Sequence, residues 1–129
     1  MKIIITHSSD LDFESILYNP IENAGFWHDH QILLPQRTGL REQITQEMIR
    51  DADLVLCEVS LPSTGQGIEI GWATLYGAPI VCFHHMDAHP SGALQFVCEE
   101  FFTYKDEVDM VEKISRYLLN VCQQNSTTI

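Results

Sequence analysis

The sequence predicts an α/β domain, specifically a flavodoxin-like (Rossmann-like) three-layer sandwich with a five-stranded, mainly parallel sheet in the order 2-1-3-4-5. Two observations predict this class. Short apolar runs rich in Ile, Val and Leu lack polar alternation, which is typical of parallel strands covered on both faces. These runs alternate with helical segments, and consecutive parallel strands need such right-handed crossovers.

Five segments are predicted as strands. The clearest are the apolar runs at residues 2–6, 53–58 and 79–84. A fourth run, at 31–34, ends at Pro35, and a shorter one at 101–104 precedes the last helix. Since five strands suit the 2-1-3-4-5 order, strands one and three are expected to be neighbours at the point where the chain reverses direction across the sheet.

Helices are predicted between these strands, at 12–19, 41–50, 67–76 and 106–123. Pro20 is expected to limit or kink the first, and Gly77 to stop the third. The last carries apolar residues at spacings of three and four, which is typical of an amphipathic helix. Residues 1–124 are therefore expected to form one domain, and residues 125–129 a frayed tail.

Composition excludes several functional classes. The 129 residues include 7 Lys and Arg against 18 Asp and Glu, a formal net charge of −11. This acidity disfavours nucleic acid polymers and anionic membrane surfaces, which bind clustered cations. No apolar run approaches the roughly 20 residues that span a bilayer, and the N-terminus turns polar too soon for a signal peptide. A cytoplasmic protein is expected.

The predicted topology places a ligand site before any motif is considered. It should be built by the loop after strand one, at 6–10, and the loop after strand three, at 59–67. The first contributes Thr6, His7 and Ser8, and His7 could donate to a base or a sugar hydroxyl. The second leads to Glu69, expected in the first turn of its helix, where the helix dipole would favour an ionised carboxylate.

Three other kinds of chemistry could be read from the sequence: a dinucleotide cofactor, a metal site and reactive cysteines. The glycines Gly65, Gly67 and Gly71 do not make a dinucleotide fingerprint, so no nicotinamide or flavin cofactor is expected. The histidines at 84, 85 and 89 follow a strand without a helical ligand pair, so no metal is expected. The cysteines form no CxxC pair and are assigned no chemistry; they are Cys57, Cys82, Cys98 and Cys122.

The segment ADLVLCEVSLPSTGQGIEIGWA, at 52–73, resembles the nucleoside 2-deoxyribosyltransferase superfamily, including its branch of 2'-deoxynucleoside 5'-monophosphate N-glycosidases. Members of that family carry Glu-Val-(Ser/Thr)-x-Pro-Ser-x-Gly-x-Gly-x-Glu after a strand. The resemblance implies that Glu69 is the nucleophile on a 2-deoxyribose and that Ser63 contacts the sugar or its phosphate. It further implies that Gly65 and Gly67 allow close approach, and that Ser91 reaches a neighbouring subunit's site in a homodimer or larger oligomer.

The resemblance implies a retaining glycosyl transfer through a glycosyl ester, with water or a second base as acceptor. Two departures from the family leave alternatives open. The first loop lacks the family's arginine, which favours a neutral nucleoside over its 5'-monophosphate. Thr45 stands where the family often has an aspartate, with Glu42 and Glu47 nearby.

A non-catalytic nucleoside- or nucleotide-binding module of the same fold is therefore the alternative to an enzyme. A phosphate-binding signalling domain is a weaker alternative, because Ser60 stands where such domains need an aspartate.

Overall fold

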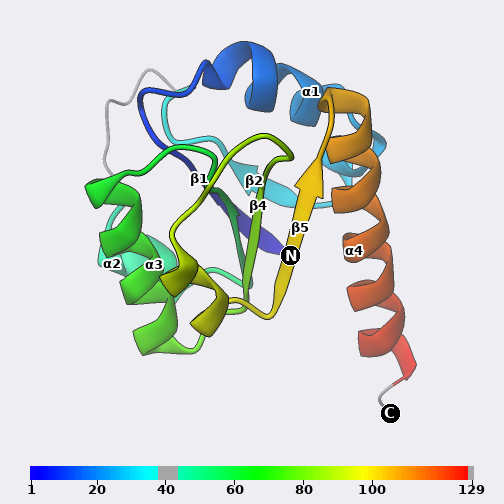
Figure 1. The fold of residues 1–129 in the computed structure, drawn as a ribbon. Coiled ribbons are helices and arrows are strands. Elements are labelled where there is room, and N and C mark those ends of the chain that lie inside the picture. Colours follow the sequence, from blue (N-terminus) through cyan, green and yellow to red (C-terminus); the bar gives the residue numbers. More distant parts are fainter. Residues whose placement is uncertain (38–43, 128–129) are drawn as a thin grey trace.

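The computed structural model describes residues 1–37 and 44–127, and its centre is a five-stranded sheet (Figure 1). The strands lie in the order β2-β1-β3-β4-β5 and every neighbouring pair is parallel, as the sequence predicts. Their bounds are β1 (Lys2–Thr6), β2 (Gln31–Leu33), β3 (Leu54–Glu58), β4 (Ile80–His85) and β5 (Glu100–Tyr104). The α/β class and the strand order are therefore confirmed.

The helical elements lie between and after the strands. They are η1 (Glu14–Tyr18), α1 (Asn19–Glu22), η2 (Gly25–His28), α2 (Gln46–Arg50), α3 (Thr64–Tyr76), η3 (Gly92–Phe96) and α4 (Glu107–Thr127). Helices α2 and α3 cover one face of the sheet, and α1 and α4 cover the other (Figure 1). This arrangement gives the three layers that the sequence predicts.

Two apolar layers hold the helices against the sheet, and successive strand residues contribute to opposite layers. Ile3, Leu56 and Phe83 pack with Ile21 of α1 and Ile114 of α4. Their chain neighbours point to the other face, among them Ile4, Val55 and Cys82, which pack with Ile70 and Ala73 of α3. Because both faces are covered, the strands have no room for polar alternation, which explains the continuous apolar runs.

The difference from the predicted elements that bears most on the candidate site lies at α3, which begins at Thr64 and not at residue 67. Ser63 caps it, because its Oγ accepts from the backbone N–H of Gln66 at 3.2 Å. Gly77 ends it with a φ of 71°, a left-handed conformation that favours glycine. Glu69 therefore lies in the second turn of α3, and the expectation of a first-turn position is wrong.

The other helix bounds also shift. The first helix begins at Glu14 as a π-helical turn and continues through Pro20 as α1, so Pro20 does not end it. Thr45 caps α2, which begins at Gln46, while Glu42 and the rest of 41–43 lie outside the described residues. Helix α4 continues through Thr127, so the tail predicted from residue 125 is helical as far as it is described.

The cysteines follow two patterns. Cys57 and Cys82 are buried, as expected of small apolar residues within strands, whereas Cys122 is exposed on α4. Cys98 is half-buried, and its Sγ lies 2.6 Å from that of Cys82. Among the described residues, no helix has both the length and the apolar character needed to cross a bilayer.

Candidate active site

Buried polar side chains gather at the carboxyl edge of the sheet. Within residues 1–37 and 44–127, the polar or charged residues that are buried are Thr6, His7, Ser8, Glu58, Gln66 and His84. Each lies at the end of β1, β3 or β4, or in the first turn of α3. Burial of a polar group is costly unless it is hydrogen-bonded, so a cluster of this kind marks this edge as a candidate functional site.

The two predicted loops meet through the side chain of Gln66. Its Nε2 donates to Thr6 Oγ1 at 3.0 Å and to the backbone oxygen of Glu58 at 2.9 Å. Thr6 ends β1 and Glu58 ends β3, the neighbouring strands where the chain order reverses. The structure thus brings the loop after β1 against the start of α3, as the topology predicts.

Glu69 is partly buried near this edge, in the second turn of α3. Burial raises the pKa of its carboxyl from the ordinary value of 4.5 to about 7. The expected effect of the helix dipole and nearby N–H groups was in the opposite direction, toward the ionised form. That expectation is wrong because the dipole acts mainly within the first turn, whereas Glu69 lies beyond it and loses water.

The position of Glu69 also bears on the alternative that this residue serves only to stabilise its helix. A glutamate in a first turn commonly serves only to stabilise the helix, but the first turn of α3 holds no acidic residue. A half-buried carboxyl that ionises near neutral pH is instead typical of groups that take part in chemistry.

Glu58 is a further acidic residue at this edge, and it is not among the site residues predicted from the sequence. It is almost wholly buried and accepts from the backbone N–H of Ser60 at 2.6 Å and from Ser60 Oγ at 2.8 Å. It also accepts from the hydroxyl of Tyr104, at the end of β5, while Ser60 Oγ accepts from the N–H of His85. Glu58 therefore ties together the ends of β3, β4 and β5.

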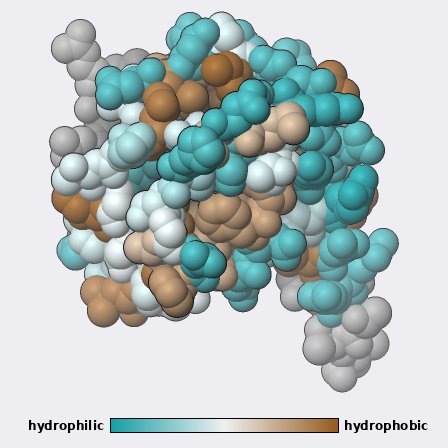
Figure 2. Space-filling view, in the orientation of Figure 1, coloured by the Kyte–Doolittle hydropathy of each residue, from teal (hydrophilic) through white to brown (hydrophobic). Residues whose placement is uncertain are grey.

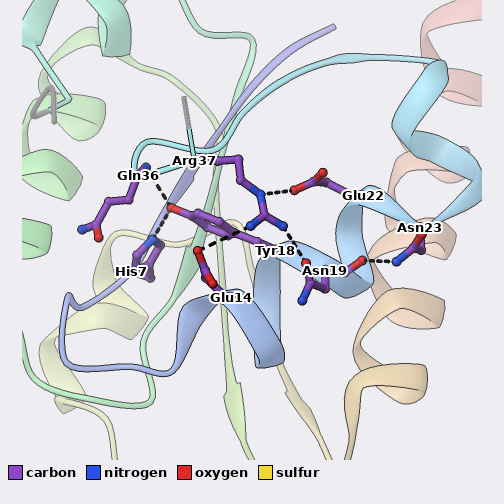
Figure 3. Close-up of polar contacts among 8 residues, drawn as sticks. All are labelled: His7, Glu14, Tyr18, Asn19, Glu22, Asn23, Gln36 and Arg37. Atoms are coloured by element: carbon purple, nitrogen blue, oxygen red, sulfur yellow. Dashed lines mark hydrogen bonds and ion pairs between the residues drawn. The ribbon is translucent and has the colours of Figure 1, made fainter. Parts of the chain in front are cut away.

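His7 is locked in place by two hydrogen bonds, and Figure 3 shows the one to Tyr18. Its Nδ1 donates to the carbonyl oxygen of Ser8 at 2.8 Å, so the neutral ring accepts at Nε2 from the hydroxyl of Tyr18 at 2.6 Å. Burial lowers the pKa of His7, partly offset by the Ser8 carbonyl and the charge of Glu58. Both ring nitrogens are thus engaged within the protein, and its donation to a substrate stays a prediction.

Tyr18 connects His7 to the loop after β2 (Figure 3). Its hydroxyl oxygen accepts from the backbone N–H of Gln36 at 3.2 Å, and its side chain is fully buried. Burial raises the pKa of Tyr18 to about 12, and the charge of Glu69 contributes to the rise. Tyr18 is therefore neutral, and Glu69 lies near enough to act on it electrostatically.

Arg37 lies over the ring of Tyr18, with its guanidinium carbon 5.8 Å from the ring centroid (Figure 3). Its Nε donates to Glu22 at 2.6 Å and its Nη2 to Asn19 Oδ1 at 2.6 Å, while Nη1 lies 3.5 Å from Glu14. The family's arginine belongs to the loop after strand one, whereas Arg37 belongs to the loop after β2. Its charge is largely matched by two carboxylates of the protein.

The two glycines predicted for the second loop lie at the start of α3, where the helix faces solvent. Gly65 and Gly67 are exposed, and a Cβ at either position would meet nothing within 4 Å. Neither has a positive φ in this structure, so backbone strain does not explain the choice of glycine. Ser8 accepts at Oγ from the N–H of Asp10 at 3.1 Å, and Ser63 accepts as the cap of α3.

Two residues that the resemblance raised lie apart from this cluster. Ser91 caps η3, is exposed, and shares no hydrogen bond with the other predicted residues in the described part of the chain. Glu47 is exposed in the first turn of α2, where Thr45 Oγ1 accepts from the N–H of Met48. Thr45 thus serves as a cap, and no contact here gives Glu47 the role of the missing aspartate.

The histidines after β4 do not assemble a ligand set. No group of three or more His, Cys, Asp or Glu side chains with the spacing of a metal site occurs within the described ranges. His85 Nδ1 lies 3.7 Å from Asp87 Oδ2, and His84 Nδ1 donates to the carbonyl of His85 at 2.7 Å. The expectation of no metal remains a prediction from the sequence.

Comparison with known proteins finds no family model that matches, but it finds a similar curated protein and solved structures of similar fold. A Syntrophotalea carbinolica protein provisionally named 2'-deoxynucleoside 5'-phosphate N-hydrolase 1 is 45% identical over 49 residues, which are 37% of this chain and 34% of that protein. The match thus spans about a third of that curated relative's length. The structure of a Clostridium botulinum CMP N-glycosidase superposes with a TM-score of 0.70 and 16% identity, over 91% of this chain and 99% of that one.

The partial sequence match supports the resemblance to the nucleoside 2-deoxyribosyltransferase superfamily, and the structural similarity supports the fold that the resemblance implies. The partial sequence match is to a protein named as an N-hydrolase of 2'-deoxynucleoside 5'-phosphates, and the shared fold extends over nearly the whole of a second N-glycosidase. At 16% identity, the structural similarity shows the fold alone.

Proposed function

We propose that this protein is an N-glycosidase that cleaves the bond between base and sugar in a 2'-deoxynucleoside or its 5'-monophosphate, with Glu69 as nucleophile. One observation carries the proposal: a half-buried carboxyl of raised pKa lies beside the buried polar groups of the carboxyl edge. The names of the two similar proteins support cleavage of an N-glycosidic bond in general.

The proposed chemistry proceeds in two displacements. Ionised Glu69 attacks the anomeric carbon, the bond to the base breaks, and the bonding electrons leave with the base, which takes a proton from solvent. Water then attacks the anomeric carbon of the glycosyl ester, which releases the sugar with net retention, frees the Glu69 carboxylate and returns a proton to solvent. A base in place of water would make the same protein a transferase, and that acceptor is left to experiment.

The desolvation of Glu69 serves this chemistry in a specific way. A carboxylate that has lost water is a better nucleophile than a hydrated one, but a smaller fraction of it is ionised at a given pH. With a pKa of about 7, roughly half of the Glu69 carboxyls are ionised at neutral pH. The turnover number should therefore rise as pH increases through 7.

Different observations support a substrate without a 5'-phosphate and a substrate with one. The absence of an arginine from the loop after β1, together with the pairing of Arg37 to Glu14 and Glu22, supports a neutral nucleoside. The names of the similar proteins, one acting on 5'-phosphates and one on CMP, support a nucleotide. We retain the nucleoside as the first expectation and the 5'-monophosphate as its direct competitor.

A homodimer or larger oligomer remains part of the proposal. Helix α3 exposes Ile68 and Leu75 on one side, and η3, which packs on the same face of the sheet as α3, exposes Phe96. Apolar groups reach the surface over this region, whereas the side occupied by α4 is mostly hydrophilic (Figure 2). A second subunit on this face would bring an outside residue near η3, where Ser91 lies, and sedimentation would measure the assembly.

One observation supports the alternative of a non-catalytic binding module. Thr45, at the position of the family's aspartate, is used as a helix cap, and Glu47 is exposed. Such a module would bind a nucleoside or nucleotide without releasing base.

One experiment separates these functions. The protein is incubated with a panel of deoxynucleosides and their 5'-monophosphates, with and without an acceptor base, and free base is followed by chromatography. We expect base release from at least one member of the panel, abolished in Glu69→Gln and retained in Glu99→Gln, an exposed acid on the other edge of the sheet. Binding of a nucleoside without base release would support the non-catalytic module.

A further inference from the structure

We propose that Gln66 is a positioning residue, which fixes Glu69 at the carboxyl edge by joining the start of α3 to the ends of β1 and β3. The inference rests on the proposed function, and its test includes a measurement that needs no catalytic activity. It concerns a residue that the motif leaves undefined, since Gln66 occupies the variable position between the two glycines.

The contacts of Gln66 are specific to a long amide. The side chain is buried, and its Nε2 has two N–H groups. One donates to Thr6 Oγ1, 60 residues away in the chain, and the other donates to the carbonyl oxygen of Glu58. An apolar side chain of the same length would fill this space but would leave a buried hydroxyl and a buried carbonyl without their donor.

The first turn of α3 has few other attachments to the sheet. Gly65 and Gly67 flank Gln66, both are exposed, and neither has a packing neighbour where a Cβ would lie. Thr64 is exposed as well, and the cap from Ser63 is a bond within the helix start itself. The apolar anchors of α3 begin only at Ile70 and continue at Ala73, beyond Glu69.

Glu69 therefore lies between one polar attachment and one apolar attachment. Gln66 precedes it by three residues, which is nearly one helical turn, and Ile70 follows it directly. Without the bonds of Gln66, the glycine-rich turn before Glu69 would be free to move away from β1 and β3. Water would then have greater access to the carboxyl of Glu69, which is now half-buried.

Two consequences follow for Glu69. Its pKa should fall from about 7 toward 4.5, because burial is the cause of the rise. Its carboxylate should also lose alignment with the anomeric carbon, and a misplacement of this kind lowers the turnover number by about 10- to 100-fold. A role limited to stability would produce neither the change in pKa nor the loss of turnover in molecules that remain folded.

The test compares Gln66→Leu with Thr74→Val. Thr74 lies on the same helix and is exposed, and its hydroxyl bonds only to the carbonyl of Ile70 among the contacts described, so it controls for the loss of a hydrogen bond within α3. The pKa of Glu69 is measured by carbon NMR of the labelled carboxyl, and the turnover number and KM are measured across pH on the best substrate of the panel.

We expect Gln66→Leu to lower the pKa of Glu69 by about one unit or more and to move the acid limb of the turnover profile to lower pH. The turnover number should fall about 10- to 100-fold with a smaller change in KM, while Thr74→Val should match the wild type. A wild-type pKa and pH profile in folded Gln66→Leu would overturn the proposal.

A second pair of variants keeps the test decisive where Gln66→Leu fails to fold. Thr6→Val removes one acceptor of Gln66 and Thr6→Ser keeps it, so only Thr6→Val should lower the pKa of Glu69. Equal pKa values in both variants would contradict the proposal. Because the NMR titration does not use catalysis, a wild-type protein without base-releasing activity would refute the proposed function and still leave the positioning by Gln66 measurable.

Discussion

Polar side chains are buried at the carboxyl edge of the sheet and exposed at its amino edge. At the carboxyl edge, Glu58 and Gln66 are buried and hydrogen-bonded to neighbouring segments of the chain. At the amino edge, a cavity of about 530 Å³ is lined by Asp53, Glu99 and Glu100, whose side chains belong to exposed residues. The acids that line this cavity are thus hydrated, whereas Glu58 at the carboxyl edge is desolvated.

This difference in hydration indicates which acidic residues are the better candidates for chemistry. An exposed carboxylate keeps its water and costs the fold little, so the acids of the amino edge are explained by solubility alone. A desolvated carboxyl destabilises the fold unless neighbours compensate, as they do for Glu58 but, among the contacts described, not for Glu69. The uncompensated group at the carboxyl edge is therefore the better functional candidate.

The largest effect is expected from Glu69→Gln, which removes the proposed nucleophile and keeps its size. Loss of a nucleophile lowers the turnover number by about 1,000-fold or more. Base release, followed by chromatography under saturating substrate, measures the effect. Full activity in this variant would place the chemistry at another residue.

The next effect concerns stability and compares the edges directly. Glu58→Ala leaves three donors without their buried acceptor, and we expect a loss of about 3 kcal/mol in the free energy of unfolding. The matched variant Glu99→Ala, at an exposed site, should change it by less than about 0.5 kcal/mol. Urea denaturation measures both, and equal losses would remove the distinction between the edges.

A third effect follows from the raised pKa of Glu69. Because the folded state holds this proton more tightly than the unfolded state, unfolding releases protons between pH 4.5 and about 7, and stability falls as pH rises through that window. Glu69→Gln should therefore be more stable than the wild type at pH 8, by about 1 to 2 kcal/mol after allowance for solvent screening, and equally stable at pH 4. Denaturation at the two pH values provides the measurement, and a variant that is less stable at pH 8 would contradict the desolvation of Glu69.

The smallest effect is expected at Tyr18, whose hydroxyl links two loops of the carboxyl edge. Tyr18→Phe keeps the buried ring but leaves His7 Nε2 and the N–H of Gln36 without this partner. We expect a loss of about 1 kcal/mol in the free energy of unfolding. The pKa of His7, followed by proton NMR, should rise, because the neutral ring would lose a donor that favours it. An unchanged histidine titration would mean that the hydroxyl does not fix the state of His7.

The sequence was sufficient to predict the fold, and the two loops that it assigned to a candidate site meet in the structure. Apolar runs such as residues 2–6 read directly as buried parallel strands, and β1 begins and ends where predicted. The helix bounds were less accurate, because α3 starts at a cap, Ser63, whose role depends on a local hydrogen bond and not on apolar periodicity. That shift of three residues moved Glu69 out of the first turn and reversed the expected direction of its pKa.

The supporting residues of the site were missed because their partners are distant in the chain. Tyr104 reaches Glu58 across 46 residues, and Gln66 reaches Thr6 across 60. A local signal did exist for Glu58: it is an acid that directly ends an apolar strand run at the predicted ligand edge. No comparable signal marked Tyr18, whose role follows only from the packing of η1 against β1.

The central claim is that Glu69 forms a covalent bond to the sugar, and trapping that bond tests it most directly. The protein is mixed with the best substrate of the panel and quenched in acid during turnover, and its peptides are mapped by mass spectrometry. We predict a deoxyribosyl adduct on the peptide that contains Glu69, at that carboxyl, and none in Glu69→Gln. Base release without any adduct at Glu69, or an adduct at another residue, would contradict the account.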